Sequence, residues 1–508
     1  MNANNSSRVT YGRTVIYSDY EQIDLTNVQD MLAKTFPIHI ENANDITYLW
    51  HYYLGCQPII NKTRELKPES NAIVIENRAN EIVSFKVGYL IGEPIQYVSR
   101  SSDERVIEDI NRLNSFLIDN DKACLDEDLA TWFTVCGTSY RMVLPNRAGF
   151  PPFSRSGAND GSGDIVSPFN VFTLDPRFAY VVYYSGLGNR PLCGVQYIVK
   201  QDGSVVFSVY TDTLYIELTS PSTLGTIVQA GNVVSMSVED TTITKYSAHT
   251  IGYVPIIEYP NNSARLGAFE PVLTLLDAIN EVASDRIDAV NDFVNALLVL
   301  KGVDLDDEDM KRLIQLGGIQ VPADGDVKYI VNNFNQNETQ SLIDHMYQAV
   351  LTIVGLPNRN GGTSTSDTGQ AVYLRDGFSS AETRAVSSEN IFKRSEKAAL
   401  RIMLKCCNTS ADTNLNISDV EIRFTRRNYE NIMGKAQVLI EMLSTDKIHP
   451  KLAFSHCGMF SDPNLAYTES EKYYKEREKE FLNEQKLITE DSADEDEAVG
   501  GRREEAEE

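Results

Sequence analysis

Residues that could do chemistry cluster at few places in this chain, and the densest cluster is the carboxylate run DLDDEDM at 304–310. Such a run can bind a divalent cation, but an EF-hand calcium loop needs acids at alternate positions and a glycine at the sixth. The alternative is helix capping, with Asp304 or Asp306 at the N-cap and further acids facing the positive helix end. The spacing favours capping, so we predict no metal site here.

Two other short stretches contain residue types that catalysis or zinc binding uses. Ser162 in DGSGD lies between glycines, but the spacing and the strand–turn–helix context of a nucleophile elbow are missing. His456 and Cys457 are adjacent, yet no second pair of zinc ligands lies near them in the sequence. The chain also lacks the phosphate-loop, dinucleotide-binding and zinc-protease motifs. We therefore predict that the protein is not an enzyme and holds neither a cofactor nor a metal.

A long amphipathic helix is predicted from Phe269 to Val299, and its polar side is acidic. Apolar residues recur along it at spacings of three and four, which marks one buried face. An acidic stripe on the other face must lie against something polar. Its members are Asp277, Glu281, Asp285, Asp288 and Asp292.

Two further features lie after a second predicted helix at about 338–354. The stretch GLPNRNGGTSTSDTG at 355–369 is too polar and too rich in glycine to be helix or strand, so it is predicted to be a loop. A third long helix then runs from about Gln370 to Cys407, and its end is basic between Lys393 and Lys405. That basic face either touches phosphate or an acidic neighbour, or is an ordinary solvated face.

The remaining elements follow from periodicity and turn residues. Residues 21–91 are predicted to be mostly helical, and the last helix should end with Gly92 in the left-handed conformation and Pro94 beyond it. A β-rich block of roughly a hundred residues begins at Thr138. A compact α/β insert follows at 300–332, the stretch DVEIRF is a strand, and residues 429–485 are again helical.

Composition limits the function classes. The formal net charge is −26, and residues 490–508 alone contain ten acids and two arginines. Such a chain should not bind nucleic acid through a broad basic patch, although it can surround DNA without gripping it. Seven cysteines without a CxxC pair indicate free, mostly buried thiols in a reducing compartment. No apolar run approaches a membrane span and no signal peptide is visible, so we expect a cytosolic protein without a membrane partner.

The order of these elements and several stretches resemble the portal (head–tail connector) proteins of long-tailed double-stranded DNA phages, particularly those of Gram-positive hosts. The resemblance covers about 40–485. It rests on YYLGCQPI, NRANEIVSFKVGYLIGEPIQY, FTLDPRFAYVVYYSGLGNRPLCGVQYI, VPIIEYPNNSARLGAFEPVLTLLDAINEVASDRIDAVNDFVNALLVLKG and NISDVEIRFTRRNYEN.

The resemblance implies an α+β, portal-type ring subunit with an α/β wing, a two-helix stem, a small α/β clip and a helical crown. The implied divisions are a flexible N-terminus (1–20), wing (21–268), first stem helix (269–298), clip (299–335), second stem helix (336–354), tunnel loop (355–369), wing helix and strand (370–427), crown (428–485) and disordered acidic tail (486–508).

The function that the resemblance implies is a ring, usually of twelve subunits, at one capsid vertex of the virion. A separate terminase motor packages double-stranded DNA through the tunnel, and the ring later anchors the tail and lets the DNA out. Implied partners are other copies of the chain, the major capsid protein, the terminase large subunit, the head–tail adaptor protein and the DNA, with assembly in the host cytoplasm. The alternative is another non-enzymatic virion assembly scaffold that has no DNA tunnel.

The same resemblance suggests which residues meet DNA. The tunnel loop is implied to project into the channel, so its candidate DNA contacts are Arg359, Asn360, Thr363 and Ser364. The acidic stripe from Asp277 to Asp292 is a candidate tunnel wall, because like charge between wall and phosphate avoids tight adhesion. The alternative is that the stripe faces solvent or pairs with a neighbour's arginine.

Overall fold

The structure is a computed structural model that describes residues 8–64, 71–101, 103–146, 167–221, 227–229, 232–235, 241–294, 297–301, 326–330, 336–358, 377–410, 412–425, 432–445, 447–460 and 463–481. The chain forms two compact units. The first contains residues 1–91 and 119–406, and the second contains residues 92–118 and 407–508.

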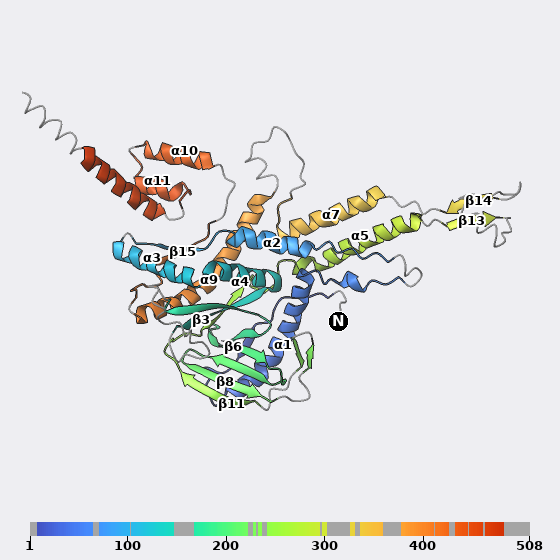
Figure 1. The fold of residues 1–508 in the computed structure, drawn as a ribbon, viewed down its shortest axis with the longest axis horizontal. Helices are drawn as coiled ribbons and strands as arrows, with labels where there is room; N and C mark the ends of the chain where they lie inside the picture. The colour runs from blue at the N-terminus through green and yellow to red at the C-terminus, as the bar shows by residue number, and fades with distance from the viewer. Residues whose placement is uncertain are drawn as a thin grey trace, which may run out of the picture. The chain divides into compact units, whose positions relative to one another are not determined.

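A six-stranded sheet packed against helix α1 (Val28–Tyr53) forms the main core of the first unit (Figure 1). Met31, Leu32 and Phe36 recur at helical spacing and are fully buried against it. The ring of Phe36 meets those of Tyr197 and Phe207 edge-on, with centroids 5.2 and 5.1 Å apart. Such aromatic pairs add to the stability that apolar burial provides.

The strands of this sheet lie in the order β1-β5-β6-β7-β8-β11, and only β1 is parallel to its neighbour. Their bounds are β1 Ile16–Ser18, β5 Ala179–Tyr184, β6 Pro191–Val199, β7 Val205–Tyr210, β8 Leu214–Ser220 and β11 Thr242–Ala248. A separate antiparallel pair is formed by β9 (Ile227–Gln229) and β10 (Asn232–Ser235).

A smaller antiparallel sheet has the order β12-β3-β4, and α4 (Lys122–Cys136) packs against it. The strands are β3 (Thr138–Pro145), β4 (Phe169–Leu174) and β12 (Ile256–Pro260), and helix α2 (Arg78–Ile91) in turn packs on α4. Helix α9 (Phe378–Thr409) joins this layer through a buried charge network.

That network is centred on the fully buried guanidinium of Arg141 on β3, which lies 2.5 Å from Asp126 of α4 and 2.9 Å from Glu396 of α9. Lys122 and the Tyr259 hydroxyl complete it by contacting Glu396 at 3.2 and 2.7 Å. Removing one partner of such a buried set typically costs about 3–5 kcal/mol, because the remaining charge stays buried and unpaired. The network therefore fixes α9 against the small sheet.

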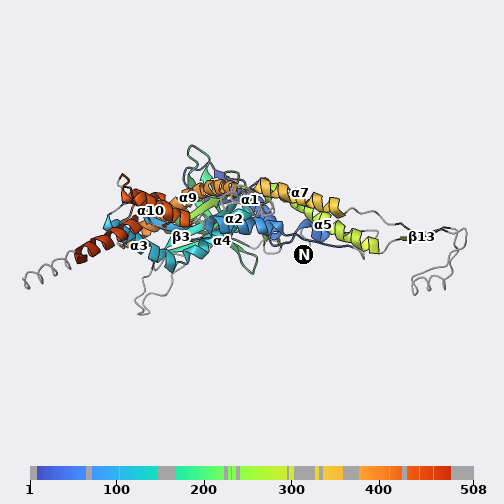
Figure 2. The same ribbon diagram turned by 90° about the horizontal axis from the view of Figure 1, so that it is seen from above.

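Helices α5 (Leu273–Val294) and α7 (Gln336–Val354) lie side by side in both views (Figures 1 and 2). A short 3₁₀ turn, η3 (Glu270–Val272), precedes α5. The segment between the two helices contains the antiparallel strands β13 (Leu297–Lys301) and β14 (Asp326–Ile330). A second 3₁₀ turn, η1 (Pro58–Asn61), follows α1 and contacts α5.

The second unit is mainly helical. It contains α3 (Glu104–Asp119), α10 (Ile432–Leu443), α11 (Pro450–His456) and a helix over 463–481. Its sheet is one antiparallel pair, in which β2 (Gln96–Ser99) lies beside β15 (Val420–Arg423). The ring of Phe454 on α11 meets those of Phe460 and Tyr467 at 5.2 and 5.9 Å.

The α+β class and most of the predicted elements are confirmed, and most differences lie at helix ends. The prediction of a flexible N-terminus over 1–20 is wrong for Ile16–Ser18, which form β1 of the main sheet. The long acidic helix is shorter than predicted, because Pro271 falls in η3 and the chain is already a strand at Leu297. Helix α2 does end before Gly92, but Gly92 is not among the glycines with positive φ. Pro94 accounts for the stop without a left-handed residue, because proline cannot continue a helix and disfavours helical conformation in the residue before it.

Two compositional predictions can also be compared with the structure. None of the seven cysteines forms a disulfide, and five of them are buried. Within the described part of the chain, no helix has both the length and the apolarity that crossing a bilayer requires.

Candidate functional site

The predicted site residues that the structure describes lie on α5, and a segment after α1 covers one side of this helix. We call residues 57–77 the strap; its residues 57–64 and 71–77 are described. The strap follows α1 and leads into α2, and its polar contacts to α5 reach across more than 200 positions of sequence.

Three polar side chains of α5 accept hydrogen bonds from alternate backbone N–H groups of the strap. Asn280 accepts from Glu76 at 2.8 Å, Ser284 from Val74 at 3.0 Å, and Asp288 from Ala72 at 2.7 Å. We call these three contacts the ladder. Four residues of helix rise about 6 Å, and two residues of extended chain rise about 6.6 Å, so the two repeats match.

The sequence prediction missed two members of the ladder, Asn280 and Ser284, and named the third, Asp288, only as part of the acidic stripe. Asn280, Ser284 and Asp288 are all buried, and they follow the border between the apolar face and the predicted acidic face, to which Asp288 itself belongs. The signal in the sequence was their spacing of four. Nothing in that spacing could identify the partner, because the strap contributes backbone N–H groups that almost every residue possesses.

Asp288 departs most from the predicted open acidic face, since its side chain is only 3% exposed. The ammonium of Lys62 lies 2.9 Å from Asp288 and 2.7 Å from Asp285. Burial alone would raise the pKa of Asp288, but the hydrogen bonds from Lys62 and from the Ala72 N–H lower it overall. Asp288 is therefore an ionised internal partner of the strap.

The other acids of the stripe differ in exposure. Asp277 is half-buried and accepts a 2.8 Å hydrogen bond from the Tyr52 hydroxyl. The pKa of Tyr52 is raised, mainly because the hydroxyl is buried and also because the Asp277 carboxylate is close to it. Glu281 is exposed, and the side chain of Asp285 is 63% exposed although Lys62 contacts it. Asp292 belongs to α5, but its side chain lies outside the described residues. Glu281 and Asp285 are thus the described acids that remain accessible.

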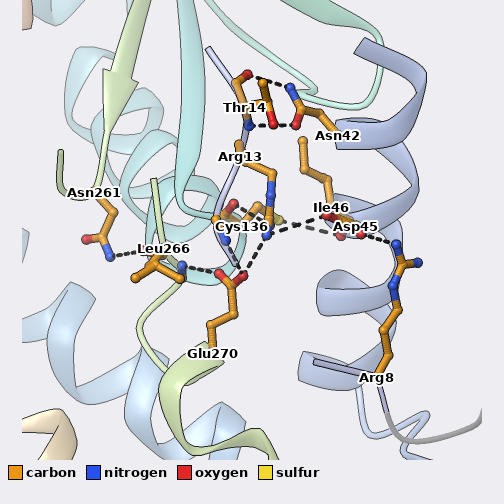
Figure 3. A network of polar contacts seen from close by, with 12 residues as sticks. Arg8, Arg13, Thr14, Asn42, Asp45, Ile46, Cys136, Asn261, Leu266 and Glu270 are labelled. Atoms are coloured by element: carbon orange, nitrogen blue, oxygen red, sulfur yellow. Dashed lines mark hydrogen bonds and ion pairs between the residues drawn. The ribbon is translucent and has the colours of Figure 1, made fainter. Parts of the chain in front are cut away.

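The start of α5 is held by a buried ion pair between Arg13 and Glu270, which Figure 3 shows from close by. Arg13 Nη2 lies 2.6 Å from Glu270 Oε1, and Arg13 Nη1 donates to the Cys136 carbonyl at 3.1 Å. Glu270 also accepts from the N–H groups of Gly12 and Gly267, at 3.0 and 2.6 Å. One carboxylate therefore connects the N-terminal arm to the turn that leads into α5.

Helix α7 contacts the same region through its own aromatic residue. The Tyr347 hydroxyl donates to Glu81 at 2.8 Å, and the Arg78 guanidinium lies 4.2 Å from the centre of the Tyr347 ring. Arg286 of α5 donates directly to Gln340 of α7. Helix α5 is therefore bound to the strap, and helix α7 to α2.

The remaining predicted residues lie elsewhere. Arg359, Asn360, Thr363 and Ser364 lie outside the described residues, as do DGSGD and DLDDEDM. On the basic face of α9, Lys393 pairs with Glu389 at 2.5 Å. Arg394, Lys397, Arg401 and Lys405 are exposed at helical spacing. In the part of the chain that is described, no three His, Cys, Asp or Glu side chains are grouped so that they could hold a metal ion.

The sequence matches the family model described as "Phage portal protein, SPP1 Gp6-like" over residues 32–493. No curated protein matches the chain.

Solved structures give a looser match. The chain resembles a chain in the neck of a native GTA particle computed with C12 symmetry, with 10% identity, a TM-score of 0.44, and coverage of 82% of this chain and 94% of that one. A chain from the virion of a native gene transfer agent (GTA) particle matches with the same identity and coverage and a TM-score of 0.43. Likeness at this level does not identify a function.

Proposed function

This chain belongs to the SPP1 Gp6-like family of phage portal proteins, and from that premise we propose that twelve copies form a ring through which double-stranded DNA enters and leaves the capsid. The protein is a virion component with a portal, or head–tail connector, role. The observation that carries the proposal is the family match, which spans 32–493 and so includes α5, the strap and α7.

In the proposed sequence of events the ring occupies one capsid vertex, within the shell of the major capsid protein. The terminase large subunit docks on it and drives DNA inward, and a head–tail adaptor protein replaces the motor when the head is full. The portal itself catalyses no reaction, and the hydrolysis that powers packaging belongs to the motor. Assembly takes place in the host cytoplasm.

We assign the parts of the subunit by the family's architecture. Helices α5 and α7 form the stem, the segment with β13 and β14 is the clip, and the sheets with α1, α2, α4 and α9 belong to the wing. Residues 428–485 form the crown, and 355–369 form the tunnel loop. The side-by-side packing of α5 and α7 supports the stem assignment.

We propose that the tunnel wall uses only part of the predicted acidic stripe. Glu281 and Asp285 are exposed, so they are available to repel the phosphate backbone. Asp288 is buried under the strap and cannot contribute in the same way. Arg359, Asn360, Thr363 and Ser364 of the tunnel loop are the proposed residues nearest the DNA.

Electron microscopy of the purified full-length protein tests the proposal directly. Class averages along the symmetry axis should show closed rings of twelve subunits with a central hole wide enough for a DNA duplex. Rings without a hole would support a virion scaffold without a tunnel. A protein that stays monomeric under all salt and concentration conditions would contradict both.

A further inference from the structure

A small cavity of about 50 Å³ lies where α2, α4, α9 and the end of α7 meet. Two cationic side chains line it, Lys86 of α2 and Arg384 of α9, and no carboxylate of the described residues does. That is unexpected in a chain with 72 acidic and 46 basic residues. Its other polar lining includes Thr134, Asn261 and Ser388, each of which can donate a hydrogen bond.

Of the two cations, Lys86 has fewer hydrogen bonds and ion pairs within the described residues. It is half-buried, and within the described residues no hydrogen bond or ion pair to its ammonium is found. Burial, and then the neighbouring charge of Arg384, lower the pKa of Lys86 to about 8. Glu382 of α9 accepts a 2.8 Å hydrogen bond from the hydroxyl of Tyr89, a lining residue on α2.

Arg384 is held in place beside Lys86 by the last turn of α7. Its Nη1 donates to the Ile353 carbonyl at 2.7 Å. Gly355, with φ +73°, leaves the space that the side chain occupies, because a Cβ there would lie 2.4 Å from Arg384 Cδ. The helix end thus offsets part of the Arg384 charge, and the Lys86 charge has no such neighbour.

We propose that this cavity is an anion-binding site that takes one phosphate-class oxyanion from solution. A water molecule needs about 10–15 Å³ of such space, so the cavity has room for a small anion. The ligand contacts the ammonium of Lys86, the outer guanidinium edge of Arg384, and hydroxyl or amide groups of the lining. It replaces the repulsion of two cations by two charge-assisted hydrogen bonds. The site does not depend on the proposed ring.

The test uses the full-length protein and inorganic phosphate, with sodium chloride matched for ionic strength at pH 7. Phosphate should raise the melting temperature of the wild type in a saturable way. Lys86→Met and Arg384→Met should each weaken phosphate binding, measured by calorimetry, by about tenfold or more, as expected for a hydrogen bond between charged groups. Lys86→Arg should retain binding.

The matched control is Lys397→Met, which removes an exposed cation of α9 and the same unit of charge. It should bind phosphate as the wild type does. Without phosphate, Lys86→Met should be at least as stable as the wild type, because it removes a half-buried charge for which the described residues supply no partner.

Two results would overturn the proposal. One is a phosphate effect that is equal in Lys86→Met and in Lys397→Met, or that sodium chloride reproduces. The other is loss of stability or of rings in Lys86→Met together with no phosphate binding by the wild type. The second result would assign Lys86 to a carboxylate of another copy of the chain.

Discussion

The ammonium group of Lys62 forms ion pairs with two carboxylates of α5, and only one of these carboxylates is accessible to solvent. Asp285 is largely exposed and Asp288 is buried. Burial would lower the pKa of Lys62, but the hydrogen bonds to both carboxylates raise it overall, so the ammonium stays charged. Lys62 is therefore the nearer of two cations beside the buried Asp288, and the other is Arg64, 3.7 Å away.

We predict that Lys62→Met destabilises the protein by about 1–3 kcal/mol, because Asp288 stays buried, loses a charged hydrogen-bond donor and keeps only Arg64, 3.7 Å away, as a cation beside it. The free energy of unfolding, measured in denaturant, gives the value. Lys34→Met is the control, since it breaks an exposed ion pair with Asp30 within one helix. It should cost much less than Lys62→Met, because an ion pair exposed to solvent contributes little to stability. Equal losses in the two variants would contradict the internal role of Asp288.

The stabilising effect of Lys62 should also depend on pH. The pKa of Asp288 is lower in the folded protein than in the unfolded chain. The pair therefore contributes fully above the unfolded pKa of about 4 and less as pH falls through the folded pKa. The stability difference between wild type and Lys62→Met should shrink as pH is lowered from about 5 towards 3. A difference that stays constant or grows would refute this.

Arg359 is the only basic residue in 357–369, so it is the residue of the proposed tunnel loop with the greatest attraction to phosphate. We predict that Arg359→Ala leaves ring formation intact and alters the length or the retention of packaged DNA. Particle assays and gel analysis of the extracted DNA measure both. Weakened rings with normal packaging in each intact ring would instead assign Arg359 to an ion pair between subunits.

At the scale of elements, the ladder determines how α5 is held. Ser284 is its central member, and its hydroxyl accepts the Val74 N–H and donates to the Asn280 carbonyl. We predict that Ser284→Ala costs about 1–2 kcal/mol of unfolding free energy, because a polar N–H then lacks an acceptor.

The variant should also increase amide hydrogen exchange in strap residues 71–77, which mass spectrometry of peptides resolves. Ser387→Ala, an exposed position on α9, is the control and should leave that exchange unchanged. Unaltered exchange in Ser284→Ala would mean that the strap is held by its other contacts.

The elements themselves were largely predictable because their signals are local. The apolar positions of α2, including Ile82, Val87 and Leu90, show helical spacing and are all buried as that spacing predicts. The site was less predictable, because its partners are distant in the sequence. The environment of Asp288 depends on Lys62 and Ala72, which lie more than 200 residues away. A periodicity argument assigns a residue to a face of a helix, but it cannot say which segment covers that face.

At the scale of the whole molecule, the large negative net charge makes the subunits of the proposed ring repel one another. A ring of twelve subunits would carry a formal charge of 12 × −26 = −312, and residues 490–508 contribute −8 to each chain. We predict that truncation after Thr489 leaves ring formation intact, because the removed segment has almost no apolar residues to bury.

Rings of the truncated protein should also persist to lower salt, since each subunit loses net repulsion when its charge changes from −26 to −18. Mass photometry across a salt series measures this. Loss of rings on truncation would show that the tail takes part in assembly.

The ladder also restricts how the strap and α5 can move past each other under load. Its acceptors repeat about every 6 Å along α5. A shift by less than this distance would leave all three strap N–H groups between acceptors. A shift of the strap by one repeat, four residues towards the start of α5, would set Leu276 opposite the strap in place of a polar residue. A shift the other way would meet Ser284, Asp288 and Asp292, which are all hydrogen-bond acceptors. Sliding is therefore stepwise, and the sequence of α5 gives it a preferred direction.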